Sequence, residues 1–135
     1  MRLNRQILLL RNMRIRNLLL YLWQLPQNLL GLLLRAVYRG EDTDCGDALV
    51  RMSQRMQGGI SLGRYIIVSE KATFGTVQHE YGHCRQSKML GPLYLLVVGL
   101  PSILHAWLCD CKKRGHNYYD FWCERWADKL GGVTR

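Results

Sequence analysis

The residues best suited to chemistry lie in the stretch QHEYGHCRQS, residues 78–87. His79 and His83 are four positions apart, and Glu80 directly follows the first. In a helix, side chains at positions i and i+4 share one face, so the two imidazoles can reach one metal ion. Glu80 is offset from the ligand positions but close enough to accept a proton from a water that the metal activates. This spacing is typical of a Zn²⁺ site in which a carboxylate acts as the general base.

A hydrolytic zinc site needs a third protein ligand and one open position. The stretch CERWAD offers Glu124 and, four positions later on the same helical face, Asp128. One carboxylate could bind the metal while the other accepts a hydrogen bond from a ligand histidine. The sequence leaves further candidates for the third ligand open, namely His105, His116, Asp120 and the cysteines. The ordinary alternatives are a surface carboxylate pair and two solvated histidines without a metal.

A helix that ends near Lys88 is expected to carry the motif. Either Ser69 or Thr73 can cap its N-terminus, and the sequence Gly-Pro at residues 91–92 provides stop signals beyond its end. The preceding segment, residues 58–70, combines glycines with β-branched and aromatic residues. This pattern predicts a small hairpin, the one clear β signal in the chain.

The rest of the chain is predicted to be helical. Residues 1–39 form one or two helices, bent where Pro26 lacks a backbone donor. A polar connector follows at residues 40–47, in which Asp44 or Asp47 caps a short helix over residues 48–57.

The C-terminal half contains a long apolar segment and a final helix. Residues 92–108 are almost entirely apolar but are divided by Gly99 and Pro101. Residues 109–117 form a polar turn, and residues 118–130 form a helix that stops at a glycine pair. We therefore predict a single-domain α+β fold of 135 residues, mostly helical, with a small β-hairpin before the HExxH helix.

The formal net charge of +9 is concentrated near the N-terminus. Residues 1–40 contain seven arginines and no acid, beside long leucine-rich stretches. This combination favours an anionic membrane surface over nucleic acid, because the charge is not interleaved with stacking aromatics. The alternative for this segment is a core helix with a solvated basic end. We divide the chain into a basic, leucine-rich segment (1–39) and a catalytic region (40–135), and whether residues 18–37 and 90–108 enter a membrane stays open.

The five cysteines are odd in number and irregularly spaced. Cys109 and Cys111 are too close for easy pairing within a helix or strand, so free thiols in a reducing compartment are predicted. A signal peptide is not predicted, because polar residues interrupt the N-terminal apolar run and no small-x-small cleavage site follows. The expected location is cytoplasmic and membrane-associated.

The HEYGH motif on one helix and ExxxD on a later helix resemble the gluzincin branch of the zincin metallopeptidases, over residues 58–132. The chain is also similar to short bacterial zincin-like proteins with an HEYGH helix, an LGPLYL segment and a terminal WAD helix. The resemblance implies that His79, His83 and Glu124 bind Zn²⁺, that Glu80 is the base and that Asp128 orients a ligand. The separate helical domain of the larger gluzincins has no room in this chain.

These observations predict a zinc-dependent hydrolase, a small membrane-associated metallopeptidase that acts on a peptide or protein substrate. Residues 60–68 are expected to bind substrate backbone by strand addition, as the edge strand of zincins does. Tyr118, Tyr119 and His116 are the candidates for stabilising an oxyanion. The competing hypothesis is a membrane-bound interaction protein with a structural or vestigial metal site, which a closed fourth coordination position would favour.

Overall fold

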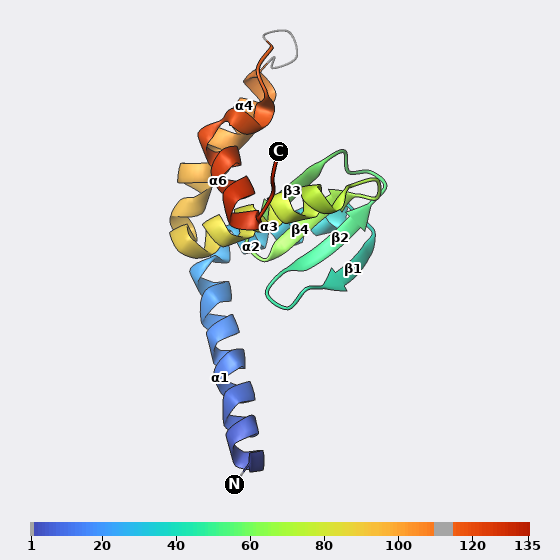
Figure 1. The fold of residues 1–135 in the computed structure, drawn as a ribbon. Coiled ribbons are helices and arrows are strands. Elements are labelled where there is room, and N and C mark those ends of the chain that lie inside the picture. The colour runs from blue at the N-terminus through green and yellow to red at the C-terminus, as the bar shows by residue number, and fades with distance from the viewer. Residues whose placement is uncertain (1, 110–114) are drawn as a thin grey trace.

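The computed structural model describes residues 2–109 and 115–135, and it describes residues 2–10 by their backbone alone. The fold is α+β, as predicted, with helices around a four-stranded sheet (Figure 1). The helices are α1 (Arg2–Trp23), α2 (Leu25–Val37), α3 (Phe74–Leu90), α4 (Leu100–Leu108) and α6 (Trp122–Gly131). The strands are β1 (Glu41–Asp44), β2 (Leu49–Ser53), β3 (Gly59–Leu62) and β4 (Tyr65–Ser69). Three short helical turns are η1 (Gly91–Leu93), η2 (Leu95–Gly99) and η3 (Tyr118–Asp120).

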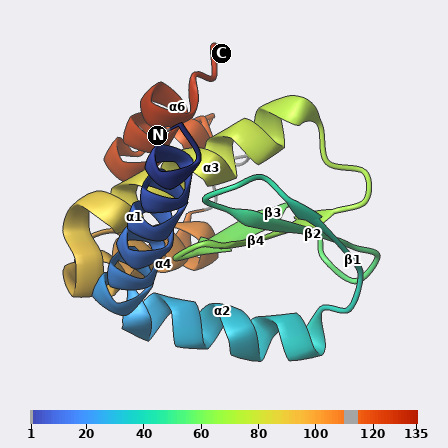
Figure 2. The same cartoon turned by 90° about the horizontal axis from the view of Figure 1, so that it is seen from below.

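The sheet has the strand order β1-β2-β4-β3, which makes β3 an edge strand. Strand β4 pairs in parallel with β2 and antiparallel with β3. Helix α2 covers one face of the sheet and α3 covers the other (Figure 2). Because β4 lies between two strands and two helices, its residues Ile66, Ile67 and Val68 are almost fully buried. The predicted hairpin is β3 and β4.

The prediction for residues 40–57 is wrong, because they form strands β1 and β2 in place of a connector and a helix. Val50 of β2 enters the core beside Ile66 of β4, so burial against a distant strand decides the conformation. Neither aspartate caps a helix. Asp44 accepts a backbone N–H within the turn that follows β1, and Asp47 accepts a hydrogen bond of 2.8 Å from the Tyr81 hydroxyl.

The N-terminal segment forms two helices, as predicted, and Pro26 lies in the first turn of α2. Polar side chains attach α2 to the body of the protein. The Gln27 amide donates to the Ser87 hydroxyl of α3 at 2.9 Å, and the Asn28 side chain accepts the backbone N–H of Arg64 in the β3–β4 turn. Helix α2 is thus packed on the core, whereas α1 extends away from it (Figure 1).

Helix α3 has the boundaries that its capping residues predict. The Thr73 side chain accepts the backbone N–H of Thr76 at the N-terminus, and Gly91 ends the helix with a positive φ of 55°. Helix α6 packs closely against α3 because small residues face each other. A Cβ on Gly82 would lie 1.9 Å from the carbonyl oxygen of Ala127, so only glycine permits this approach.

The final helix is shorter than predicted, because α6 begins at Trp122 after the separate turn η3. The side chain of Asn117 accepts the backbone N–H of Tyr119 and starts that turn. The predicted end is correct, since Gly132 adopts the left-handed conformation beyond α6.

No single helix among residues 2–109 and 115–135 is long and apolar enough to cross a membrane. The pair Phe74–Leu93 and Leu95–Leu108 meets the length and composition requirement only together, with a bend of 119° between its members.

The cysteine prediction is correct for Cys45, Cys84 and Cys123, which are free. It is wrong for Cys109, which is disulfide-bonded. Cys109 lies just past the end of α4, outside a regular helix or strand. Cys111 and most of the predicted turn lie outside the described residues.

Candidate metal centre

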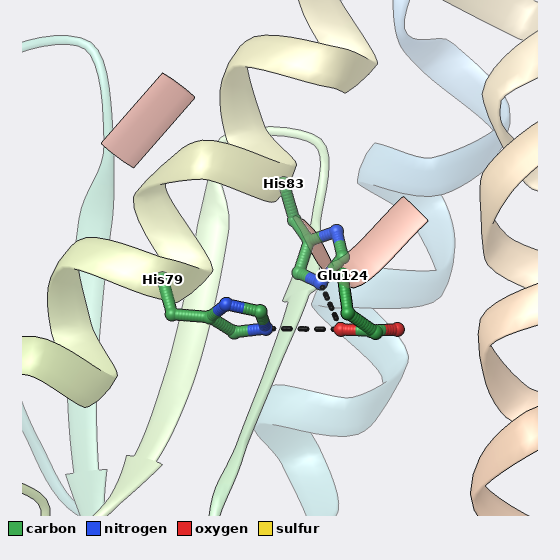
Figure 3. Close-up of side chains that lie close together, drawn as sticks. All are labelled: His79, His83 and Glu124. Atoms are coloured by element: carbon green, nitrogen blue, oxygen red, sulfur yellow. Dashed lines mark hydrogen bonds and ion pairs between the residues drawn. The ribbon is translucent and has the colours of Figure 1, made fainter. Parts of the chain in front are cut away.

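The structure brings His79, His83 and Glu124 together in a buried cluster that could hold a metal ion (Figure 3). The Nε2 atoms of the two histidines lie 3.0 and 3.1 Å from the same atom, Oε2 of Glu124. Potential ligand atoms of all three residues lie within 4.8 Å of one another. Both histidines come from α3 and the glutamate comes from α6, so the close packing of these two helices creates the cluster.

Each histidine is oriented by a hydrogen bond at its other ring nitrogen. Nδ1 of His79 lies 2.7 Å from Oδ1 of Asp128, and Nδ1 of His83 lies 2.7 Å from Oε1 of Gln86. The Gln86 amide in turn donates to the carbonyl oxygen of Cys123 at 2.9 Å. Acceptors at Nδ1 keep a proton there, so Nε2 is the nitrogen that would give up its proton and bind a metal. Asp128 was predicted from the sequence but Gln86 was not, although its position three residues after His83 was the available signal.

The second carboxylate oxygen of Glu124 accepts a hydrogen bond from the hydroxyl of Ser102 in α4. Burial by itself would raise the pKa of Glu124, but the contacts with His79 and His83 outweigh it and lower that pKa. The carboxylate is therefore ionised in the cluster, as metal ligation requires. Ser102 is also a contact that the sequence did not reveal.

Glu80 is buried beside the cluster without being part of it. Burial raises the pKa of its carboxyl group, which makes the carboxylate a stronger base. The carboxylate lies against Gly59 of the edge strand β3, where an added Cβ would come within 2.7 Å of Oε1. Strand β3 therefore passes directly over the group expected to accept a proton.

A cavity of about 420 Å³ opens onto the cluster and onto Glu80. Strand β3 and helices α3 and α4 border it, and both Tyr118 and Tyr119 line it. Burial and the charge of Glu124 raise the pKa of Tyr118, so its hydroxyl stays protonated and able to donate. His116 is exposed and does not line the cavity, so we do not retain it as an oxyanion stabiliser.

None of the other third-ligand candidates among the described residues joins the cluster, although Sγ of Cys123 lies 3.6 Å from Oε1 of Glu124. His105 is partly buried, donates a hydrogen bond of 3.1 Å from Nε2 to the carbonyl oxygen of Tyr118, and stacks on Phe121. Asp120 is exposed. Of the candidates within the described residues, Glu124 is the one whose oxygen atom meets both histidines.

Arg135 contacts two residues, Asp128 and Tyr119, that in turn contact His79 of the cluster. After the turn at Gly132, its Nε donates to Oδ2 of Asp128 at 2.8 Å, and its guanidinium carbon lies 3.3 Å from the ring centre of Tyr119. The Tyr119 ring meets the His79 ring edge to face, with centroids 5.1 Å apart. Arg135 therefore fixes both groups that hold His79 in place.

Replacement of Arg135 by alanine is expected to weaken metal binding about tenfold, because Asp128 would lose the partner that orients it toward His79. Arg135→Lys should recover part of the loss, since an ammonium keeps the charge but not the paired geometry. Competition with a chromophoric chelator measures the affinity, and Arg125→Ala, which removes an exposed arginine of α6, is the control. Equal affinities in the wild type and in Arg135→Ala would contradict this role.

No protein-family model, curated protein or solved structure matches the chain.

Proposed function

We propose that the protein is a zinc-dependent hydrolase, a small membrane-associated metallopeptidase. One observation carries the proposal: two histidines and a glutamate converge in a buried cluster, next to a buried glutamate that does not take part in it. A purely structural metal site is closed by its protein ligands, so it requires neither a second carboxylate beside the ligands nor a cavity that opens onto it. This arrangement favours an enzyme over an interaction protein with a structural metal.

The donor set fits zinc. Two ligand atoms bound tetrahedrally at about 2.0–2.1 Å from zinc lie about 3.3 Å apart. The separations of 3.0 and 3.1 Å between the imidazole nitrogens and the Glu124 oxygen are close to that value, whereas the three ligand atoms together span up to 4.8 Å, so the two histidines would move closer to each other around a bound ion. Two imidazoles with one carboxylate also suit zinc better than magnesium or calcium, which prefer oxygen ligands.

The residues of the chain have separate tasks in this mechanism. Zinc, when bound, would supply Lewis acidity that makes a water more acidic and polarises a substrate carbonyl. Glu80 accepts the proton of the attacking water and passes it to the leaving amine. Its raised pKa suits both steps, because the group must gain and lose a proton within one turnover. Tyr118, protonated and at the cavity wall, is positioned to donate to the developing oxyanion.

The edge strand supports a peptide as the substrate. Strand β3 pairs with β4 on one side only, and its residues line the cavity. An extended peptide can add to the free edge and pass over Glu80 and the histidines. Only the β3 part of the expected segment, residues 60–68, can serve in this way, because β4 is an interior strand.

The basic N-terminal segment supports a location at an anionic membrane surface. Arg11, Arg14 and Arg16 on α1 are exposed, and each base near such a surface contributes about 1 kcal/mol. Leucines on the same helix are exposed as well, among them Leu18 and Leu22. Arginines among the head groups and leucines at the acyl boundary are typical of a helix that lies on a membrane.

Removal of the metal tests the enzymatic proposal. Protein stripped with a chelator is expected to lose cleavage of a randomised peptide library, measured by mass spectrometry, and to regain it with stoichiometric zinc. Zinc at about 100 times its dissociation constant should also stabilise the folded state by about 2.7 kcal/mol, seen as a higher melting temperature. Cleavage that persists in zinc-free protein, or a zinc-loaded protein that cleaves nothing, would count against a metallopeptidase.

A further inference from the structure

The segment formed by η2 and α4 presents bulky apolar side chains to the outside. Five of these residues define its outer face: Leu96, Leu100, Leu104, Trp107 and Leu108. Trp107 is 81% exposed and Leu108 is 76% exposed, although α4 is the most apolar helix of the described chain. No residue of α4 is fully buried. Apolar patches of this kind on a folded protein mark a surface that meets a partner.

The inner face of the same segment forms a wall of the cavity. Gly99, Ser102, Ile103 and Ala106 line it, at the spacing i, i+3, i+4 and i+7 of one helical face. Ser102 also donates to the metal-site carboxylate of Glu124. Whatever covers the outer face therefore lies one helix diameter, about 10 Å, from the reacting groups.

The surroundings of the outer face identify a lipid surface as its partner. The exposed side chains of Met89 and Leu93 extend it toward α1, where Trp23 packs on Gly91 and is itself half exposed. In both views α1 and α4 lie on the side of the molecule away from β1, and Figure 1 shows them toward opposite ends of that side (Figures 1 and 2). The exposed arginines of α1 supply the positive charge that an anionic bilayer attracts. Leucine and tryptophan beside arginine is the composition of a membrane-surface contact.

We infer that the outer face of η2 and α4 lies in the surface of an anionic membrane, and that the substrate is a peptide segment held at that surface. The part of the inference that concerns cleavage rests on the proposed function, whereas the part that concerns docking does not. Because the cavity wall is seated in lipid, a peptide at the membrane reaches β3 without first entering bulk water.

Hydrogen exchange of the full chain tests the docking. With vesicles of phosphatidylcholine and phosphatidylglycerol, the amides of residues 95–108 should exchange at least about tenfold more slowly than without vesicles. The double variant Leu104→Ser/Trp107→Ser should lose this protection. Phe74→Ser is the matched control. Phe74 is 77% exposed, but it lies at the N-terminal end of α3, whereas the segment with the outer face follows the C-terminal end of that helix. Exchange that vesicles do not change, or protection that appears without lipid as the concentration rises, would overturn the inference, the latter in favour of self-association.

Two peptide libraries test the substrate class. The same randomised library is offered free in solution and attached by a lipid anchor to the vesicles. The ratio of anchored to free cleavage should exceed about 10, since confinement raises the effective concentration at the cavity. The ratio should fall toward one in Leu104→Ser/Trp107→Ser and stay high in Phe74→Ser. An equal rate on both libraries in the wild type would overturn the substrate class.

The two experiments separate the possible failures. If zinc-loaded protein cleaves neither library while lipid still protects residues 95–108, the metallopeptidase proposal and the substrate class fail and the docking stands. If the free library is cut but lipid protects nothing, the proposed function stands and the docking is wrong.

Discussion

Replacement of Glu124 by alanine is expected to abolish stoichiometric zinc binding. One oxygen of this carboxylate faces Nε2 of both His79 and His83, so the change removes the ligand that the two histidines share. The remaining histidine pair should bind zinc at least about 100-fold more weakly. Loss of a residue that only orients a ligand lowers metal affinity by up to about 100-fold, and loss of the ligand itself should cost at least as much. Metal analysis after gel filtration, together with titration against a competing chelator, measures both the stoichiometry and the affinity.

Controls for this variant must separate the lost ligand from lost structure. Glu124 is fully buried and accepts a hydrogen bond from Ser102, so alanine also leaves that hydroxyl unpaired. Glu124→Gln keeps the size and an acceptor for Ser102 but removes the charge, and it should bind zinc more weakly than the wild type while folding normally. Glu70→Ala removes an exposed acid and should change neither property. Stoichiometric zinc of wild-type affinity in Glu124→Ala would exclude Glu124 as a ligand.

The parts of the fold that local signals specify were predictable from the sequence. Thr73 and Gly91 mark the two ends of α3, and a glycine turn between β-branched runs marks the β3–β4 hairpin. Strand β1 carries no such signal, because its residues Glu41–Asp44 have the composition of a loop. It becomes a strand by pairing with β2, and Arg51 of β2 holds Asp42 through its Nε at 2.7 Å. The β-propensity of a short segment does not show whether it will pair with a strand elsewhere in the chain.

The metal cluster shows the same division between local and long-range information. The spacing of His79 and His83 lies within a single helix, so the sequence alone places both imidazoles on one face. The contacts of Ser102 and Arg135 depend on how the chain returns to α3 after the bend at η2 and after the turn that follows α6. The spacing of residues in the sequence predicts neither of these two contacts. Glu124 was predictable as a candidate, but its selection over His105 required the packing of α6 on α3.

The Glu80→Gln protein should fold readily, so this variant is the sharpest test of the catalytic proposal. Burial raises the pKa of Glu80, so as pH rises the unfolded chain releases this proton before the folded chain does. Ionisation of Glu80 therefore costs stability in the metal-free protein at neutral pH. The amide carries no charge and has nearly the same shape, so it fits the close contact with Gly59. The metal-free variant should melt at or above the temperature of the wild type.

The zinc-loaded Glu80→Gln protein is expected to retain its metal and to lose peptide cleavage by about 10²- to 10⁴-fold, the usual contribution of a general base. The metal should stay because Glu80 lies beside the cluster and is not part of it. The loss should follow because an amide cannot take the proton of the attacking water. Initial rates on the peptide library at equal zinc content measure the effect, with Glu70→Gln, the same change at an exposed site, as the control. A Glu80→Gln protein that cleaves at the wild-type rate would exclude Glu80 as the base, whereas one that also loses its zinc would instead make Glu80 part of the metal site.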